Sequence, residues 1–143
     1  MSHDTSGKDA AIHRFFRAVD ARDWETVAAG LTDQVQLDYT SLFDGDPEVL
    51  SGAEVVARWQ GLLPGFDATM HLLGPALHHG ETTQCNVRGY HHLDGQTWVV
   101  AGWYTLTLNS SERDPLLAGI TLDVSYEEGD RGLVERAQAR AGA

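Results

Sequence analysis

The chain has 143 residues, 42% of them hydrophobic and 22% charged, so it is long enough to form one domain with a core of its own. Acidic residues outnumber basic ones by 21 to 10, and the net charge of −11 argues against a protein that binds nucleic acids or anionic membranes. Cys85 is the only cysteine, so no internal disulfide can form, and no apolar stretch is long enough to span a membrane; we therefore expect a cytoplasmic protein.

The N-terminal part is predicted to be mainly helical. Residues 1–9 are polar and are expected to form a flexible tail ahead of a single domain over residues 10–143. A first helix is predicted from Ala10, because apolar residues recur at i, i+3, i+4 and i+7 and form one stripe: Ile12, Phe15, Phe16 and Val19. Asp23 can cap a second helix, which Gly30 is expected to end.

A strand and a third helix are predicted next. Leu37 and Tyr39 alternate with polar residues, which is typical of a half-buried strand, and Tyr39 falls on its inner face. Ser51 can cap a helix over residues 52–62, which includes Trp59. The Pro-Gly pair that follows is expected to end this helix.

The second half alternates in the manner of strands. Four are predicted, over residues 68–77, 82–93, 97–108 and 116–126, with the Asp-Gly pair at 94–95 as a hairpin signal and a short helix within 128–140. This order of elements predicts an α+β fold, in which about three N-terminal helices cover one face of a curved antiparallel sheet. Such a sheet encloses an apolar pocket of the kind that binds small molecules.

The alternation also predicts which side chains face the pocket. In residues 82–93 the odd positions are the more apolar, so His91 is expected to point inward and His92 outward. In residues 97–108 the even positions are the more apolar. The pocket is therefore expected to include Phe16, Trp59, Tyr104, Leu106 and Leu108.

Few residues in the sequence suit chemistry by pattern alone. His71 has no charged neighbour in sequence and is either a buried histidine bonded to the backbone or a proton carrier, and Asp20, at the edge of the first apolar stripe, is either solvated or functional. No metal is expected, since paired cysteines and helical histidine pairs are absent, although His71 and His91 with an acid remain an alternative. Nucleotide-binding and serine-hydrolase motifs are also absent, so no cofactor is expected.

Four short motifs follow one another along the chain: VDARDW at 19–24, LDYTSL at 37–42, TMH at 69–71 and GYHHL at 89–93. In sequence, order and spacing over residues 10–126 they resemble the SnoaL-like branch of the nuclear transport factor 2-like superfamily, and within it scytalone dehydratase. The resemblance implies a cone-shaped, strongly bent antiparallel sheet packed on three helices.

The resemblance also implies a catalytic site. In scytalone dehydratase an acid on the first helix pairs with a histidine on the strand after the third helix, and the pair moves a proton during loss of water; these positions match Asp20 and His71. A tyrosine that orients a water or a substrate oxygen matches Tyr39. The second catalytic histidine of the dehydratase falls near Thr97, and His91 is the neighbouring imidazole that can replace it.

Other positions depart from the dehydratase. Val19, Leu106 and Leu108 stand where the dehydratase has polar residues. The departures imply a more apolar substrate than that of the dehydratase.

These observations predict a cofactor-independent dehydratase, isomerase or cyclase that acts on a small, largely apolar, carbonyl-bearing metabolite. One alternative is a non-catalytic small-molecule-binding or accessory protein of the same fold. Another is an epoxide hydrolase, which needs an inward arginine, whereas Arg88 is expected to face outward. The expected partners are the small-molecule substrate and a second copy of the chain, in a homodimer through the outer sheet face, where Trp103 would otherwise be exposed.

Overall fold

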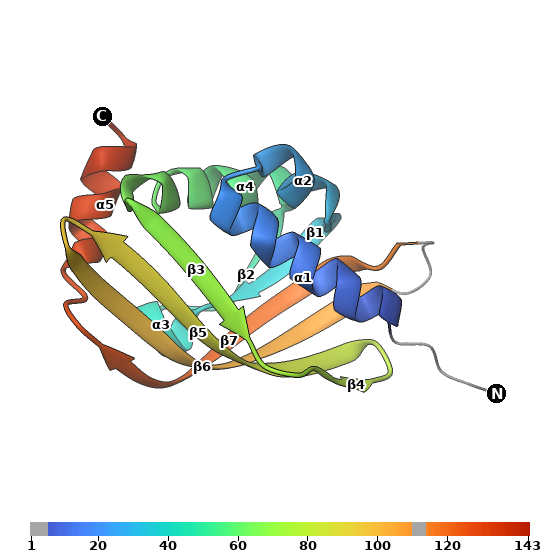
Figure 1. Ribbon diagram of the computed structural model, residues 1–143. Helices are drawn as coiled ribbons and strands as arrows, with labels where there is room; N and C mark the ends of the chain where they lie inside the picture. Colours follow the sequence, from blue (N-terminus) through green and yellow to red (C-terminus); the bar gives the residue numbers. More distant parts are fainter. Residues whose placement is uncertain (1–5, 110–113) are drawn as a thin grey trace.

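The computed structural model describes residues 6–109 and 114–143 (Figure 1). Its helices are α1 (Ser6–Ala21), α2 (Trp24–Ala29), α3 (Thr40–Phe43), α4 (Gly52–Gln60) and α5 (Leu133–Ala141), with a 3-10 turn η1 (Leu63–Gly65). Its strands are β1 (Leu31–Asp38), β2 (Glu48–Ser51), β3 (Ala68–Leu73), β4 (Leu77–His79), β5 (Thr82–Leu93), β6 (Gln96–Asn109) and β7 (Leu116–Glu128). The predicted α+β class is confirmed.

All seven strands form one sheet in the order β2-β1-β7-β6-β5-β3, with β4 also paired to β5. Every strand pair is antiparallel except β1 with β7, so the expectation of a fully antiparallel sheet is wrong at that pair. A parallel pair needs a long connection, and here more than 70 residues of chain separate the two strands. Strand β2 was not predicted, because its four residues are exposed or half-buried and show no apolar alternation.

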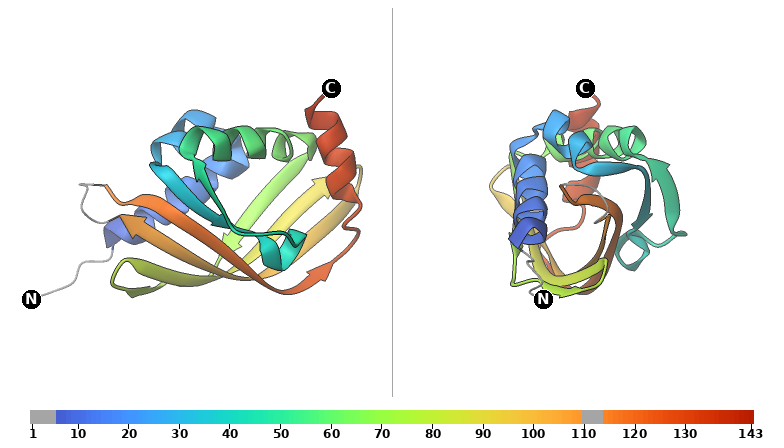
Figure 2. Two further views of the ribbon diagram at one scale, coloured as in Figure 1. Left: turned by 180° about the vertical axis from the view of Figure 1, so that it is seen from behind. Right: turned by 90° about the vertical axis from the view of Figure 1, so that its right-hand side faces the viewer.

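The helices α1, α2 and α4 lie over one face of the sheet, and the strands bend beneath them (Figures 1 and 2). Both layers contribute to one core, which includes Ile12, Phe15, Val35, Leu106 and Ile120. Along β5 the inward odd positions are buried and most even positions are exposed, so the predicted alternation of this strand is confirmed. His91 accordingly lies inside and His92 lies outside.

Helix α1 begins four residues earlier than expected, so residues 6–9 of the predicted tail are helical, and residues 1–5 lie outside the described part of the chain. Tertiary contacts hold this first turn. The Asp9 carboxylate is 2.7 Å from Nε2 of His78, and Lys8 Nζ donates to the Gly80 carbonyl at 2.7 Å. These contacts join residues about 70 positions apart and leave no local pattern in the sequence.

Local caps set the start of the next two covering helices. Asp23 accepts hydrogen bonds from the backbone N–H and the hydroxyl of Thr26, which begins α2. Ser51 and Glu54 form a reciprocal capping box at the start of α4. Both starts were predicted from the capping residue.

The C-terminal helix α5 packs on η1 at one end of the sheet. Leu133 and Ala137 of α5 are fully buried. A Cβ atom at Gly65 would lie 1.8 Å from the Ala137 carbonyl oxygen, so only glycine permits this approach. Within the described ranges, no helix is both long and apolar enough to cross a membrane.

Candidate active site

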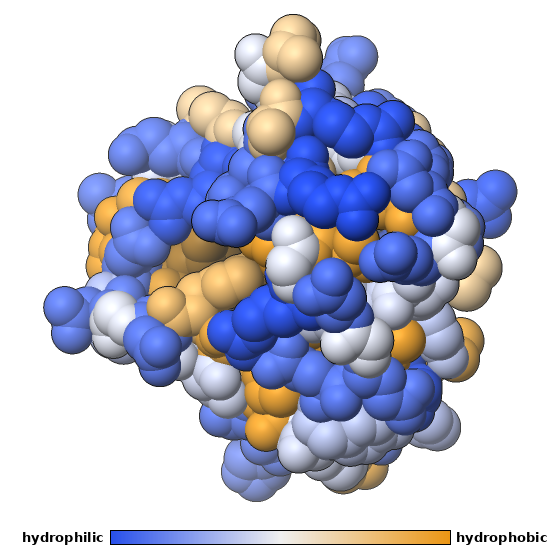
Figure 3. Space-filling model, turned by 90° about the vertical axis from the view of Figure 1, so that its left-hand side faces the viewer, coloured by the Kyte–Doolittle hydropathy of each residue, from blue (hydrophilic) through white to orange (hydrophobic). Residues whose placement is uncertain are grey.

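A cavity of about 300 Å³ lies between the bent sheet and the helices that cover it. Apolar and aromatic side chains make up much of its wall, among them Phe16, Leu37, Trp59, Val87, Trp98 and Leu122. Figure 3 looks at the end of the molecule where α3 and α5 lie, and apolar side chains are visible there in a recess framed by hydrophilic ones. The size and the lining are typical of a site for a small apolar molecule.

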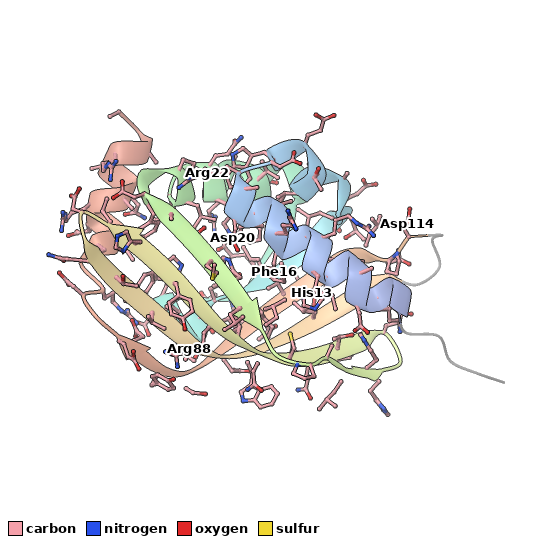
Figure 4. The ribbon with its side chains drawn as sticks, in the orientation of Figure 1. His13, Phe16, Asp20, Arg22, Arg88 and Asp114 are labelled. Carbon is pink, nitrogen blue, oxygen red and sulfur yellow. The ribbon has the colours of Figure 1, made fainter. Side chains whose placement is uncertain are left out.

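Asp20 and His71 form a pair at the wall of this cavity. His71 Nδ1 is 2.7 Å from Asp20 Oδ1, and the His71 backbone N–H donates to Asp20 Oδ2 at 2.8 Å. Thr69, two residues earlier on the same face of β3, donates its hydroxyl to Asp20 Oδ1 at 2.9 Å. The imidazole lines the cavity, whereas Asp20 lies behind it on the sheet-facing side of α1 (Figure 4).

The carboxylate of this pair is ionised. Burial alone would raise the pKa of Asp20, but the hydrogen bonds from His71 and Thr69 and the charge of His71 outweigh it and hold the pKa below its usual value. An ionised carboxylate only accepts hydrogen bonds, so Nδ1 of His71 carries a proton. Nε2 is then the nitrogen of His71 that can take a proton from a molecule in the cavity.

His91 is a second imidazole of the cavity wall, with its ring centroid 6.2 Å from that of His71. Its Nδ1 is 3.1 Å from the Trp98 carbonyl, to which it donates, and its ring lies 4.6 Å from the Trp98 ring. Burial, with a further contribution from the neighbouring His71, lowers the pKa of His91 to about 4. This imidazole is therefore neutral at physiological pH, and its chemistry differs from that of His71.

Gly89 makes room for both imidazoles. It pairs with His71 across the β3–β5 ladder. A Cβ atom at this position would lie 3.2 Å from Cε1 of His91 and 3.9 Å from Cδ2 of His71. Gly89 lies in the GYHHL motif, but nothing in the sequence around it indicates this role.

Tyr39 and Tyr104 place two hydroxyl groups at the cavity. Burial raises the pKa of Tyr39 to about 12, although its hydrogen bond with Tyr104 acts in the opposite direction. Burial raises the pKa of Tyr104 further, and the charge of Tyr39 and the hydrogen bond to it add to this effect. Both hydroxyl groups therefore keep their hydrogen at neutral pH, and either can donate a hydrogen bond.

Of the five predicted pocket residues, three line the cavity and two do not. Phe16 stacks on Tyr104 with ring centroids 4.9 Å apart, and Trp59 lines the cavity from α4. Leu106 and Leu108 are fully buried in the core instead, and Leu108 borders a second, smaller cavity. The expectation for these two is wrong because the inner face of β6 beyond Tyr104 packs into the core, where Leu108 and Phe15 of α1 border the same second cavity.

Arg22 supports the site from behind and was missed from the sequence. Its guanidinium Nη2 donates to the carbonyls of Leu63, at 3.2 Å, and of Phe66, at 2.5 Å. Leu63 lines the cavity, and the Phe66 ring lies 5.1 Å from that of His91. The bonds join α1 to a turn more than 40 positions away, so no sequence spacing indicates them.

Two further residues named from the sequence, Arg88 and Cys85, do not join the site, and the metal alternative is not supported. Arg88 lies on the outer side of the sheet, where it contacts the rings of Tyr90 and Tyr126 (Figure 4). Cys85 is buried, and burial raises the pKa of its thiol to about 11. In the part of the chain that the structure describes, no three histidine, cysteine or acidic side chains are grouped to hold a metal ion, so the alternative with His71 and His91 gains no support.

Comparisons with known proteins identify the family of this chain. Residues 9–113 match the model of the SnoaL-like domain. A search of curated proteins finds no match to the sequence.

Solved structures share the fold at low sequence identity. The Kfla4162 protein from Kribbella flavida is 20% identical, with a TM-score of 0.80 over 98% of this chain and 97% of that one. A scytalone dehydratase-like protein from Novosphingobium aromaticivorans is 11% identical, with a TM-score of 0.76 over 89% and 87%. The Δ5-3-ketosteroid isomerase from Mycobacterium sp. is 14% identical, with a TM-score of 0.67 over 81% and 91%.

The predicted resemblance is thus confirmed at the level of family and fold. The match spans most of the chain, and the bent sheet under its covering helices is shared with dehydratase-like and isomerase structures. The chain belongs to the SnoaL-like family and has the nuclear transport factor 2-like fold.

Proposed function

We propose that this protein is a cofactor-independent acid–base enzyme, a dehydratase, isomerase or cyclase, that acts on a small, largely apolar molecule with a carbonyl group. The observation that carries the proposal is the 2.7 Å contact between Asp20 and a His71 imidazole that faces an apolar cavity. Dehydratase-like and isomerase proteins that share the fold support the same class of chemistry.

His71 is the proton carrier in this proposal. Its Nε2 takes a proton from the carbon next to the substrate carbonyl and returns it at another position or to a leaving hydroxyl group. Asp20 keeps Nδ1 protonated and stabilises the imidazolium that forms. A positioned general base of this kind accelerates a reaction by roughly 10²–10⁴-fold.

Tyr39 is the electrophilic group. As the carbon loses its proton, negative charge develops on the carbonyl oxygen, and a hydroxyl donor in an apolar site stabilises that charge. Burial raises the pKa of Tyr39 to about 12, so its hydroxyl keeps its hydrogen at neutral pH and can donate it to that oxygen. His91, which stays neutral, accepts or positions a polar group of the substrate without adding charge.

Proton exchange tests this proposal without knowledge of the natural substrate. The protein is incubated in D₂O with 2-tetralone and with a Δ5-3-ketosteroid, and NMR follows deuterium uptake next to the carbonyl and movement of the double bond. We expect the wild type to accelerate at least one of these steps about 100-fold or more over His71→Asn. If ligands bind but no exchange occurs, the non-catalytic binding alternative replaces the proposal.

A further inference from the structure

The cavity entrance carries mainly negative charge. Three of the cavity-lining residues are exposed acids, Asp44, Asp46 and Glu48, and they follow α3 along the chain. Among the lining residues that the structure describes, Arg58 is the one lysine or arginine. Both of its Nη atoms bond the Glu48 carboxylate, at 2.5 and 3.0 Å, so its charge is already neutralised.

The groups packed around this entrance do not reverse the balance. Glu54 lies close enough to Arg58 and Glu48 for each charge to act on its pKa. Arg131 lies close enough to Asp44 for their charges to interact, but it forms a two-bond ion pair with Glu127. Around the entrance, these five acidic side chains therefore outnumber the two arginines, and each arginine is already paired with a carboxylate.

Over residues 6–109 and 114–143, the cavity wall also lacks a lysine or arginine side chain that could pair with an incoming anion. The charge of a protonated His71 is compensated by Asp20 at 2.7 Å. His91 donates to the Trp98 carbonyl and stays neutral. Arg22 does not line the cavity and is bonded to two backbone carbonyls.

We propose that this cavity takes uncharged or positively charged molecules and rejects those with a carboxylate, sulfonate or phosphate group. An anion that enters would lose its hydration, pass the carboxylates of Asp44 and Asp46, and find no free counterion at the wall. The proposal names the charge class of the substrate of the proposed enzyme. It rests on the proposed function in one respect, which is that the same cavity binds the substrate.

Two fluorescent probes that differ by one charged group test the inference by binding alone. N-phenyl-1-naphthylamine is neutral, and 8-anilinonaphthalene-1-sulfonate has the same rings with a sulfonate added. Their affinities are measured for the wild type, for Asp44→Asn/Asp46→Asn, and for Glu25→Gln/Glu81→Gln, which removes two exposed acids outside the cavity. Asparagine suits position 44, where φ is +59°.

We expect the entrance variant to bind the sulfonate about tenfold more tightly, with the affinity for the neutral probe unchanged and the control variant like the wild type. In about 1 M salt, where the Debye length is about 3 Å, the wild type should approach the variant. Equal effects on both probes, a sulfonate affinity insensitive to variant and salt, or failure of the neutral probe to bind would each overturn the inference. His71→Asn should retain the probe preference, so a failed catalytic proposal is distinguishable from a failed charge preference.

Discussion

Asp20 determines which nitrogen of His71 carries the proton. Since the ionised carboxylate accepts from Nδ1, nitrogen-15 NMR of the wild type should show His71 in the Nδ1–H form at neutral pH. Asp20→Asn removes the acceptor charge, so we expect the Nε2–H form to appear in that variant. A wild-type His71 with its proton on Nε2 would contradict the proposed base.

His91 makes the free energy of unfolding of the protein depend on pH. Burial lowers its pKa from 6.5 to about 4, so between these values the unfolded chain binds more protons than the folded one. The contribution of neutral His91 to stability is complete above pH 6.5 and is lost as the pH falls towards 4, a difference of up to about 3 kcal/mol.

The variant His91→Asn isolates this effect. Its amide can still donate to the Trp98 carbonyl but does not titrate, so its free energy of unfolding should fall less than that of the wild type across this window. Denaturant unfolding at several pH values measures the difference. Parallel curves for the two proteins would show that His91 binds protons equally in the folded and unfolded states, which would contradict its lowered pKa.

The close packing of η1 on α5 makes Gly65 sensitive to any side chain. Gly65→Ala puts a methyl group against the Ala137 backbone, so α5 must shift, and we expect a loss of about 1–3 kcal/mol in unfolding free energy. Relative to the wild type, amide hydrogen exchange in Gly65→Ala should speed up more in α5 than in β5. Gly7→Ala is the control, because a Cβ there meets nothing within 4 Å; equal behaviour of the two variants would refute the packing argument.

Local patterns predicted most elements of this fold, and their failures have physical causes. Strand β5 begins and ends where the alternation does, and Ser51 and Asp23 begin their helices as capping residues should. Strand β2 was missed because its four residues are exposed or half-buried and show no apolar alternation. The parallel β1–β7 pair was missed because pairing between distant segments leaves no periodic signal. Leu108 was misplaced because alternation gives the face of a strand but not what lies above it.

Only part of the candidate site could be predicted from the sequence. Inward alternation identified His91, whereas the pairing of Asp20 with His71 came from the family resemblance. The Thr69 and Arg22 contacts bridge 40 to 50 positions and depend on how α1 lies against the sheet. No spacing in the sequence encodes that arrangement.

The outer face of the sheet bears exposed apolar side chains over several strands. Met70, Leu72, Trp103 and Tyr126 are 60%, 55%, 41% and 46% exposed. Exposed apolar patches of this kind mark interaction surfaces, so we expect the protein to form a homodimer through this face. Analytical ultracentrifugation should show a dimer that Trp103→Asp converts to a monomer. A wild type that stays monomeric at high concentration would refute the dimer.

The proposal that Asp20 and His71 move a proton as one unit is tested most directly by a double-variant cycle on the exchange reaction. Exchange rates are compared for the wild type, Asp20→Asn, His71→Asn and the double variant, with folding checked by circular dichroism. Asparagine at 71 keeps a donor near Asp20 but removes Nε2, so we expect His71→Asn to slow exchange by roughly 10²–10⁴-fold. The double variant should be no slower than His71→Asn alone. Two results would contradict the paired mechanism. One is an exchange rate of His71→Asn equal to that of the wild type, and the other is a double-variant loss of rate equal to the product of the two single-variant losses.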